Sequence, residues 1–124
     1  MSAGRTGLIA AALLLVAAEA TAGTADVVAV DIAAEAGGSY RVSVTIRSDE
    51  TGWDKYADRW EVLGPDGEIL AIRILHHPHV EEQPFTRSLG GVEVPAGIDQ
   101  VTLRAHDSLD GYGGAEMTVP LPGR

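Results

Sequence analysis

The sequence predicts an all-β fold in which seven antiparallel strands form two packed sheets. Apolar and polar residues alternate with a period of two through most of the chain after residue 25, and clusters of Gly and Pro separate the alternating segments. Beyond the N-terminal segment, no stretch shows the 3.6-residue apolar spacing of an amphipathic helix. Seven short strands in about 100 residues are typical of a β-sandwich with the immunoglobulin or fibronectin type III architecture.

Residues 1–22 have the features of a secretory signal peptide that is removed from the mature protein. Arg5 supplies the positive charge, residues 7–18 form an apolar run, and residues 20–22 (Ala-Thr-Ala) form a small-x-small cleavage site. The run is shorter than the roughly 20 residues that a membrane span requires, and no Cys follows it to carry a lipoprotein anchor. We therefore expect one domain, residues 23–124, that is periplasmic or secreted, with no membrane insertion after cleavage.

The first four strands are expected in residues 26–35, 40–48, 59–63 and 68–75. In the first, alternate residues form the core face, namely Val28, Val30, Ile32 and Ala34. The second begins at Tyr40 and alternates most strictly. In the third, Trp60 and Val62 are expected in the core. The fourth follows a turn in which Pro65 presets φ and Gly67 supplies a positive φ.

The last three strands are expected in residues 85–94, 99–107 and 115–121. Residues 76–84, which precede these strands, are not expected to form a regular strand. They contain Pro78 and Pro84, and proline cannot donate a ladder hydrogen bond. Gly90 and Gly91 predict a bulge in the fifth strand. The sixth strand alternates again, and its expected core face consists of Val101, Leu103 and Ala105.

Strand parity predicts that the two ends of the sandwich differ. Successive antiparallel strands reverse direction, so alternate connections fall at the same end. One end then carries the tight turns at residues 37–39, 65–67 and 95–97. The other end carries three longer connections, residues 49–58, 76–84 and 108–114, which contain or adjoin all four histidines. Long loops on a rigid scaffold are where function usually resides, so we expect the binding site at that end.

A cluster of histidines predicts a metal site after the fourth strand. His76, His77 and His79 lie within four residues, and Glu81 follows closely. Imidazole and carboxylate groups are ligands that suit Cu(II) or Zn(II). The expected ligands are His77, His79 and His106, with Asp107 or Glu81 assisting. In the alternative interpretation, His76 continues the strand as a partly buried residue and the other histidines are solvated.

Aromatic residues predict a second candidate site at the same end. Trp53 and Tyr56 are flanked by acidic residues and could stack on a sugar or a cationic ligand, or could anchor a partner protein. The other candidate residues for such binding are His76, Asp110 and Tyr112, with Phe85 as a third aromatic anchor. In the alternative, Trp53 folds over the end of the sandwich as a plug. The aromatic site would make the chain a non-catalytic interaction module of the cell envelope.

Composition and motifs exclude several classes of function. The net charge of −9 argues against nucleic acid and anionic lipid as partners, because both require a basic surface. The absence of Cys excludes disulfides and thiolate chemistry. The sequence contains no phosphate loop, GxSxG, HExxH or dinucleotide motif. We therefore expect a monomer that is not an enzyme and that binds a metal ion or an envelope protein.

Two strings of residues resemble known families. The string HPHVEEQPFTRSL (residues 77–89), with the GYGG loop at residues 111–114, resembles a family of small uncharacterised exported proteins from proteobacteria. The last two strands, with Asp110 and Gly111 between them, are distantly similar to periplasmic copper-resistance proteins of the CopC family, which implies a small exported sandwich that binds Cu(II) through His and Asp. This sequence has Tyr112 where that family often has His.

Overall fold

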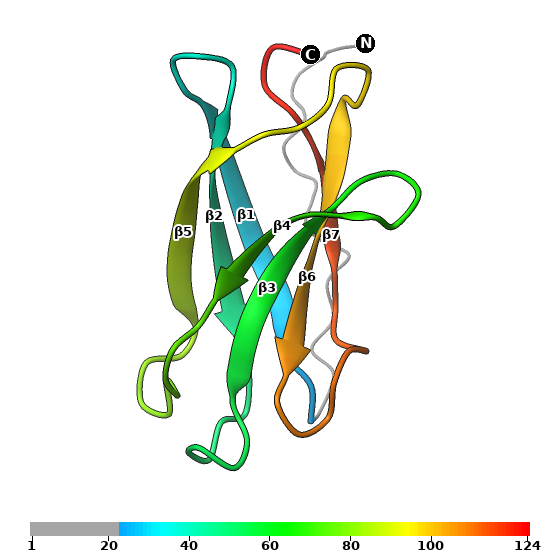
Figure 1. The fold of residues 1–124 in the computed structure, drawn as a ribbon. Helices are drawn as coiled ribbons and strands as arrows, with labels where there is room; N and C mark the ends of the chain where they lie inside the picture. The colour runs from blue at the N-terminus through cyan, green and yellow to red at the C-terminus, as the bar shows by residue number, and fades with distance from the viewer. Residues whose placement is uncertain (1–22) are drawn as a thin grey trace, which may run out of the picture.

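Residues 23–124 are described by a computed structural model, in which they form seven strands (Figure 1). The predicted signal peptide, residues 1–22, lies outside the described residues. The strands are β1 (Asp26–Ala34), β2 (Tyr40–Arg47), β3 (Ala57–Leu63), β4 (Ile69–Ile74), β5 (Phe85–Val92), β6 (Gln100–Asp107) and β7 (Met117–Pro120). Each of them overlaps the strand expected at that place in the sequence.

The strands form two antiparallel sheets, which confirms the predicted β-sandwich. One sheet has three strands in the order β1-β2-β5, and the other has four strands in the order β4-β3-β6-β7. All five strand pairings are antiparallel. Among residues 23–124, no helix is long and apolar enough to cross a membrane.

The core lies between the two sheets and consists of the inward residues of the alternating strands. Trp60 on β3 and Phe85 on β5 are the largest fully buried side chains. They pack in one cluster with aliphatic residues such as Val44, Ile46 and Leu103. The sequence prediction that Trp60 lies in the core is confirmed, and the buried cluster explains how a domain without Cys holds its two sheets together.

The predicted core face of the first strand was right in its middle and wrong at both of its ends. The register between β1 and β2 shifts between Val27 and Ala29. This irregularity reverses the inward and outward alternation, because each residue added to one strand turns the following side chains to the other face. Val27 is consequently fully buried, and Val30 and Ile32 pack against the core. Val28 is only half-buried and Ala34 is exposed.

The two ends of the sandwich differ as strand parity predicted. The connections at residues 48–56, 75–84 and 108–116 extend from one end, at the bottom of Figure 1, and we call this the loop end. The turns that follow β1 and β5 lie at the opposite end, and the turn that follows β3 projects sideways from the upper half of the sandwich. The fold therefore brings the chemically rich segments together.

Candidate functional site

Lys55 ties three segments of the loop end together. Its Nζ donates hydrogen bonds to the Gly23 carbonyl oxygen at 2.6 Å, to Asp107 Oδ2 at 2.6 Å and to Asp110 Oδ2 at 3.0 Å. The lysine is the only one in the sequence. One ammonium group thus links the N-terminal segment, the β2–β3 loop and the β6–β7 loop.

Asp107 is the buried anion at the centre of this arrangement, and its side chain has no exposed surface. Oδ1 accepts hydrogen bonds from the backbone N–H groups of Leu109 and Asp110, while Oδ2 faces Lys55. Burial alone would raise the pKa of Asp107, but the hydrogen bonds from Lys55, Asp110 and Leu109 outweigh burial and lower that pKa below its usual value. Asp107 is therefore an ionised structural residue whose oxygens are already occupied.

The β6–β7 loop packs closely on the N-terminal segment at Gly114. A Cβ atom at this position would lie 1.9 Å from the Ala25 carbonyl oxygen. Next to it, the Ala115 N–H donates to Asp26 Oδ1 at 2.7 Å, and the Val27 N–H donates to the Ala115 carbonyl oxygen at 2.9 Å. Only glycine allows this approach of two backbones. The loop is consequently fixed to the sandwich at both of its ends.

Glu50 connects the β2–β3 loop to the β4–β5 loop. Its Oε2 accepts hydrogen bonds from Ser48 Oγ at 2.6 Å and from the Ala57 N–H at 3.2 Å. Its Oε1 accepts a hydrogen bond from the His79 N–H at 2.6 Å. The Gln83 side chain adds a second connection, because it accepts from the Ser48 N–H and donates to the His79 carbonyl oxygen. The bases of the loops are therefore held by buried or half-buried hydrogen bonds.

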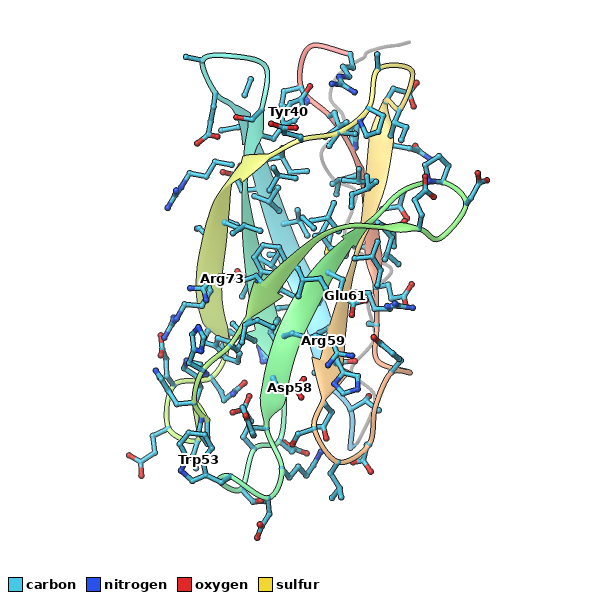
Figure 2. All side chains as sticks on the ribbon, in the orientation of Figure 1. Tyr40, Trp53, Asp58, Arg59, Glu61 and Arg73 are labelled. Carbon is cyan, nitrogen blue, oxygen red and sulfur yellow. The ribbon has the colours of Figure 1, made fainter. Side chains whose placement is uncertain are left out.

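Apolar side chains on the β2–β3 and β6–β7 loops project beyond these fixed bases. Trp53 is 68% exposed and projects from the loop end, as Figure 2 shows. Its ring meets Tyr56 edge-to-face with 5.6 Å between centroids. Ser108 exchanges two hydrogen bonds with the Tyr56 backbone, and Leu109, which follows it, is 66% exposed. We call Trp53, Tyr56 and Leu109 the tip patch.

The exposure of Trp53 rules out one of the two interpretations that the sequence left open. Trp53 is not a plug over the core, and its side chain is available to a ligand. Sequence reasoning missed Leu109, for which the signal was a single large apolar residue within a polar, Gly-containing loop. Asp110, the residue after Leu109, forms an ion pair with Lys55.

His77 and His79 come together in the β4–β5 loop. Their rings lie 4.7 Å apart, and His79 also stacks on Phe85 with 4.0 Å between centroids. His79 is only 6% exposed, and neither of its ring nitrogens has a hydrogen-bond partner. Burial lowers the pKa of His79, and Arg87 and His77 lower it further against the opposing effect of Glu50 and Glu82. His79 is therefore neutral at pH 7. His76, the third histidine of this segment, is exposed to solvent.

The five predicted metal ligands do not converge. His106 Nδ1 lies 2.7 Å from Asp58 Oδ1, on the outer face of the four-stranded sheet, whereas His79 packs on β5 of the other sheet. Asp107 is engaged by Lys55, and Glu81 is exposed. Within residues 23–124, no group of three or more His, Asp or Glu side chains could hold a metal ion. Parity brought the loops to one end, but the side chains face different sides of it.

A polar cluster on the outer face of the four-stranded sheet contains Tyr112. Glu61 on β3 is 1% exposed and accepts hydrogen bonds from Arg59 Nε at 2.9 Å, Arg104 Nη2 at 2.6 Å and the Tyr112 hydroxyl at 2.8 Å. The Arg104 guanidinium also lies 3.9 Å from the centroid of the Tyr112 ring. Figure 2 shows Asp58, Arg59 and Glu61 along β3. Tyr112, a predicted ligand-binding residue, thus gives its hydroxyl to this cluster, while its side chain remains 40% exposed.

Burial alone would raise the pKa of Glu61. The hydrogen bonds from Arg59, Arg104 and Tyr112 outweigh that effect and hold the pKa below its usual value. Sequence reasoning missed this network, because the alternation of β3 and β6 places these residues on the solvent face. The two arginines and the tyrosine cover the carboxylate there.

Comparison with known proteins gives one informative similarity. No family model matches the chain, and no solved structure matches it significantly. A curated protein from the halophilic archaeon Halomicrobium mukohataei, described as "Putative lipoprotein", is 43% identical over 95 residues. The match covers 77% of this chain and 46% of that protein, so the chain spans about half the length of its relative.

The description of the relative fits the exported or cell-envelope location that the sequence predicts. The predicted proteobacterial origin of the family is not supported, because the relative is archaeal. The comparisons give no link to the CopC family.

Proposed function

We propose that the protein is an exported, non-catalytic module that docks a partner protein through the tip patch. The observation that carries this proposal is the exposed Trp53 side chain on a loop whose base is fixed by Glu50 and Lys55. A large aromatic side chain that is exposed on a fixed loop loses little conformational entropy on binding. Trp and Tyr are also the residues that most often dominate the binding energy of protein interfaces.

The charges around the tip patch indicate the chemistry of the partner. Asp54 is exposed next to Trp53, and the Asp110 side chain is 41% exposed beside Leu109. The cation of the same loop, Lys55, is neutralised by Asp107 and Asp110. The whole chain carries a net charge of −9. An apolar surface on the partner, surrounded by basic residues, would complement the patch.

Export is supported by two independent features. Residues 1–22 combine a positive charge, an apolar run and a small-x-small site. The archaeal relative carries a lipoprotein description. A module of this kind would meet its partner in the cell envelope or outside the cell.

Replacing Trp53 with alanine tests the docking function. We expect the Trp53→Ala protein to melt at the same temperature as the wild type, because the side chain is exposed. Its affinity for the partner should fall at least about 10-fold, as is typical of an aromatic hot spot. The measurement is crosslinking capture from an envelope fraction with immobilised residues 23–124, followed by the dissociation constant of the captured protein after purification.

The matched control is Ile69→Ala, which removes a half-exposed apolar side chain from the opposite end of the sandwich. This variant should capture the partner as the wild type does. Equal capture by the wild type and by Trp53→Ala would show that the tip patch does not bind the partner.

We further propose weak binding of Cu(II) or Zn(II) by His77 and His79 as a second function. The supporting observation is the buried His79 ring, whose two nitrogens have no partner and which lies 4.7 Å from the His77 ring. The neutral imidazole is the form that binds metals. In a calorimetric titration, we expect binding of one ion with a micromolar dissociation constant that is lost in His77→Ala and kept in His106→Ala. Binding that is absent, or unchanged in His77→Ala, would contradict this assignment.

A further inference from the structure

The segment that leads into β1 lies against the β6–β7 loop (Figure 1). The Gly23 carbonyl oxygen accepts a hydrogen bond from Lys55 Nζ at 2.6 Å. A Cβ atom placed on Gly23 would lie 3.2 Å from Asp110 Oδ2. Two residues further on, Ala25 is 1% exposed and its carbonyl oxygen packs against Gly114. The segment is therefore held against the loop from Gly23 onward.

The charges beside Gly23 do not balance. Lys55 Nζ lies 2.6 Å from Asp107 Oδ2 and 3.0 Å from Asp110 Oδ2. Within residues 23–124, Lys55 is the one basic side chain that forms an ion pair with either carboxylate. Asp107 is fully buried, whereas the Asp110 side chain is 41% exposed. One ammonium group thus serves two carboxylates, and a second cation beside Asp110 would neutralise the pair.

We propose that export processing supplies this second cation as the α-ammonium group of Gly23. The proposal rests on the small-x-small motif at residues 20–22, which predicts cleavage before Gly23. Hydrolysis of that peptide bond consumes one water molecule, leaves a carboxylate on the released peptide and leaves an amine on Gly23. The amine is mostly protonated at pH 7, because the usual pKa of an α-amino group is about 7.7–8.0. The new ammonium group pairs with Asp110 and fastens the start of the mature chain to the β6–β7 loop.

Glycine at this position allows the ammonium group to reach Asp110. After cleavage, the nitrogen can turn about the Cα–C bond while Lys55 holds the Gly23 carbonyl group. About one third of a turn places the nitrogen where a Cβ atom would lie, because both are substituents of a tetrahedral Cα at similar bond lengths. That position is 3.2 Å from Asp110 Oδ2, which is within the distance of an ion pair.

Lys55 and the terminal amine lose their charges at different pH. Burial alone would lower the pKa of Lys55, but the hydrogen bonds to Asp107 and Asp110 outweigh burial and raise that pKa. The same two carboxylates raise the pKa of the Gly23 amine against the opposing charge of Lys55. The stability that the amine contributes is therefore complete below about pH 7.7, and it is lost as the pH rises through the raised pKa. Lys55 remains charged over that interval.

Two chains that differ only at the N-terminus test this pairing. All seven strands and the core lie within residues 23–124, so a chain that begins at Gly23 contains the whole domain. The second chain consists of residues 20–124, which moves the ammonium group three residues away from Gly23. We expect the chain that begins at Gly23 to melt about 2–4 °C higher at pH 6.5, as befits a partly exposed ion pair in a domain of this size. The difference should vanish by about pH 10.

Asp110→Asn separates the ion pair from other effects of the extension. In this variant the two chains should melt at the same temperature. The matched control Asp49→Asn removes an exposed carboxylate from the β2–β3 loop and should keep the full difference. Trp53→Ala should also keep it, which separates this pairing from the docking function. The proposal is overturned if the two wild-type chains melt together, if their difference persists in Asp110→Asn or at pH 10, or if N-terminal sequencing of the exported protein begins at a residue other than Gly23.

Discussion

Replacing Glu61 with alanine is expected to lower the free energy of unfolding by about 3–5 kcal/mol, because it leaves two arginines without their shared anion. The carboxylate is 1% exposed and accepts hydrogen bonds from Arg59, Arg104 and Tyr112. Without it, the guanidinium groups lose their partner and the Tyr112 hydroxyl loses an acceptor. The loss also leaves a gap between β3 and β6 on the outer face.

Urea denaturation at pH 7 measures this effect for Glu61→Ala and for the isosteric control Glu61→Gln. The amide keeps the shape and one acceptor oxygen but removes the negative charge, so an intermediate loss of stability is expected. A loss below about 1 kcal/mol in Glu61→Ala would show that the network behaves as an ordinary surface ion pair.

Replacing Asp107 with alanine is expected to cost about 3 kcal/mol of stability and to loosen the loop end. The fully buried carboxylate holds Lys55 and the backbone N–H groups of Leu109 and Asp110. Without it, Lys55 retains only the Gly23 carbonyl oxygen and the more exposed Asp110. Urea denaturation gives the free energy, and amide hydrogen exchange should speed up in residues 108–111.

The pH dependence of the same site has a definite sign. The pKa of Asp107 is lowered in the folded protein, so its ionised form stabilises the fold above its usual pKa of about 3.9, and this contribution is lost as the pH falls through the lower folded pKa. Asp107→Asn should therefore be less stable than the wild type at pH 7, and the difference should shrink in acid. A difference that is constant with pH would contradict an ionised Asp107.

The strands could be predicted from the sequence because their side chains alternate in polarity. The strict alternation from Tyr40 identified β2, and Pro78 and Pro84 correctly kept the following loop outside the sheets. The prediction failed at β1, where the irregularity between Val27 and Ala29 reverses the alternation without any glycine or proline to signal it.

The candidate site was predictable only at the level of whole loops. Parity placed the histidine-rich loop and the glycine-rich loop at one end. It could not show that His106 turns to Asp58 while His79 stacks on Phe85, because ring orientation depends on the neighbours that folding supplies. The exposure of Trp53 was likewise open, since the sequence allowed both a plug and a binding residue.

The sequence by itself determined the all-β class, the order of the strands and the end at which the long loops meet. These properties follow from local periodicity and from the reversal of direction at each turn. Only the tertiary structure decided which charges pair, because the 18 acidic and nine basic residues allow many combinations and strand register selects among them. The tertiary structure placed Glu61 between two arginines and paired the buried Asp107 with Lys55. It also left Trp53 and the isoleucines of β4 exposed to solvent.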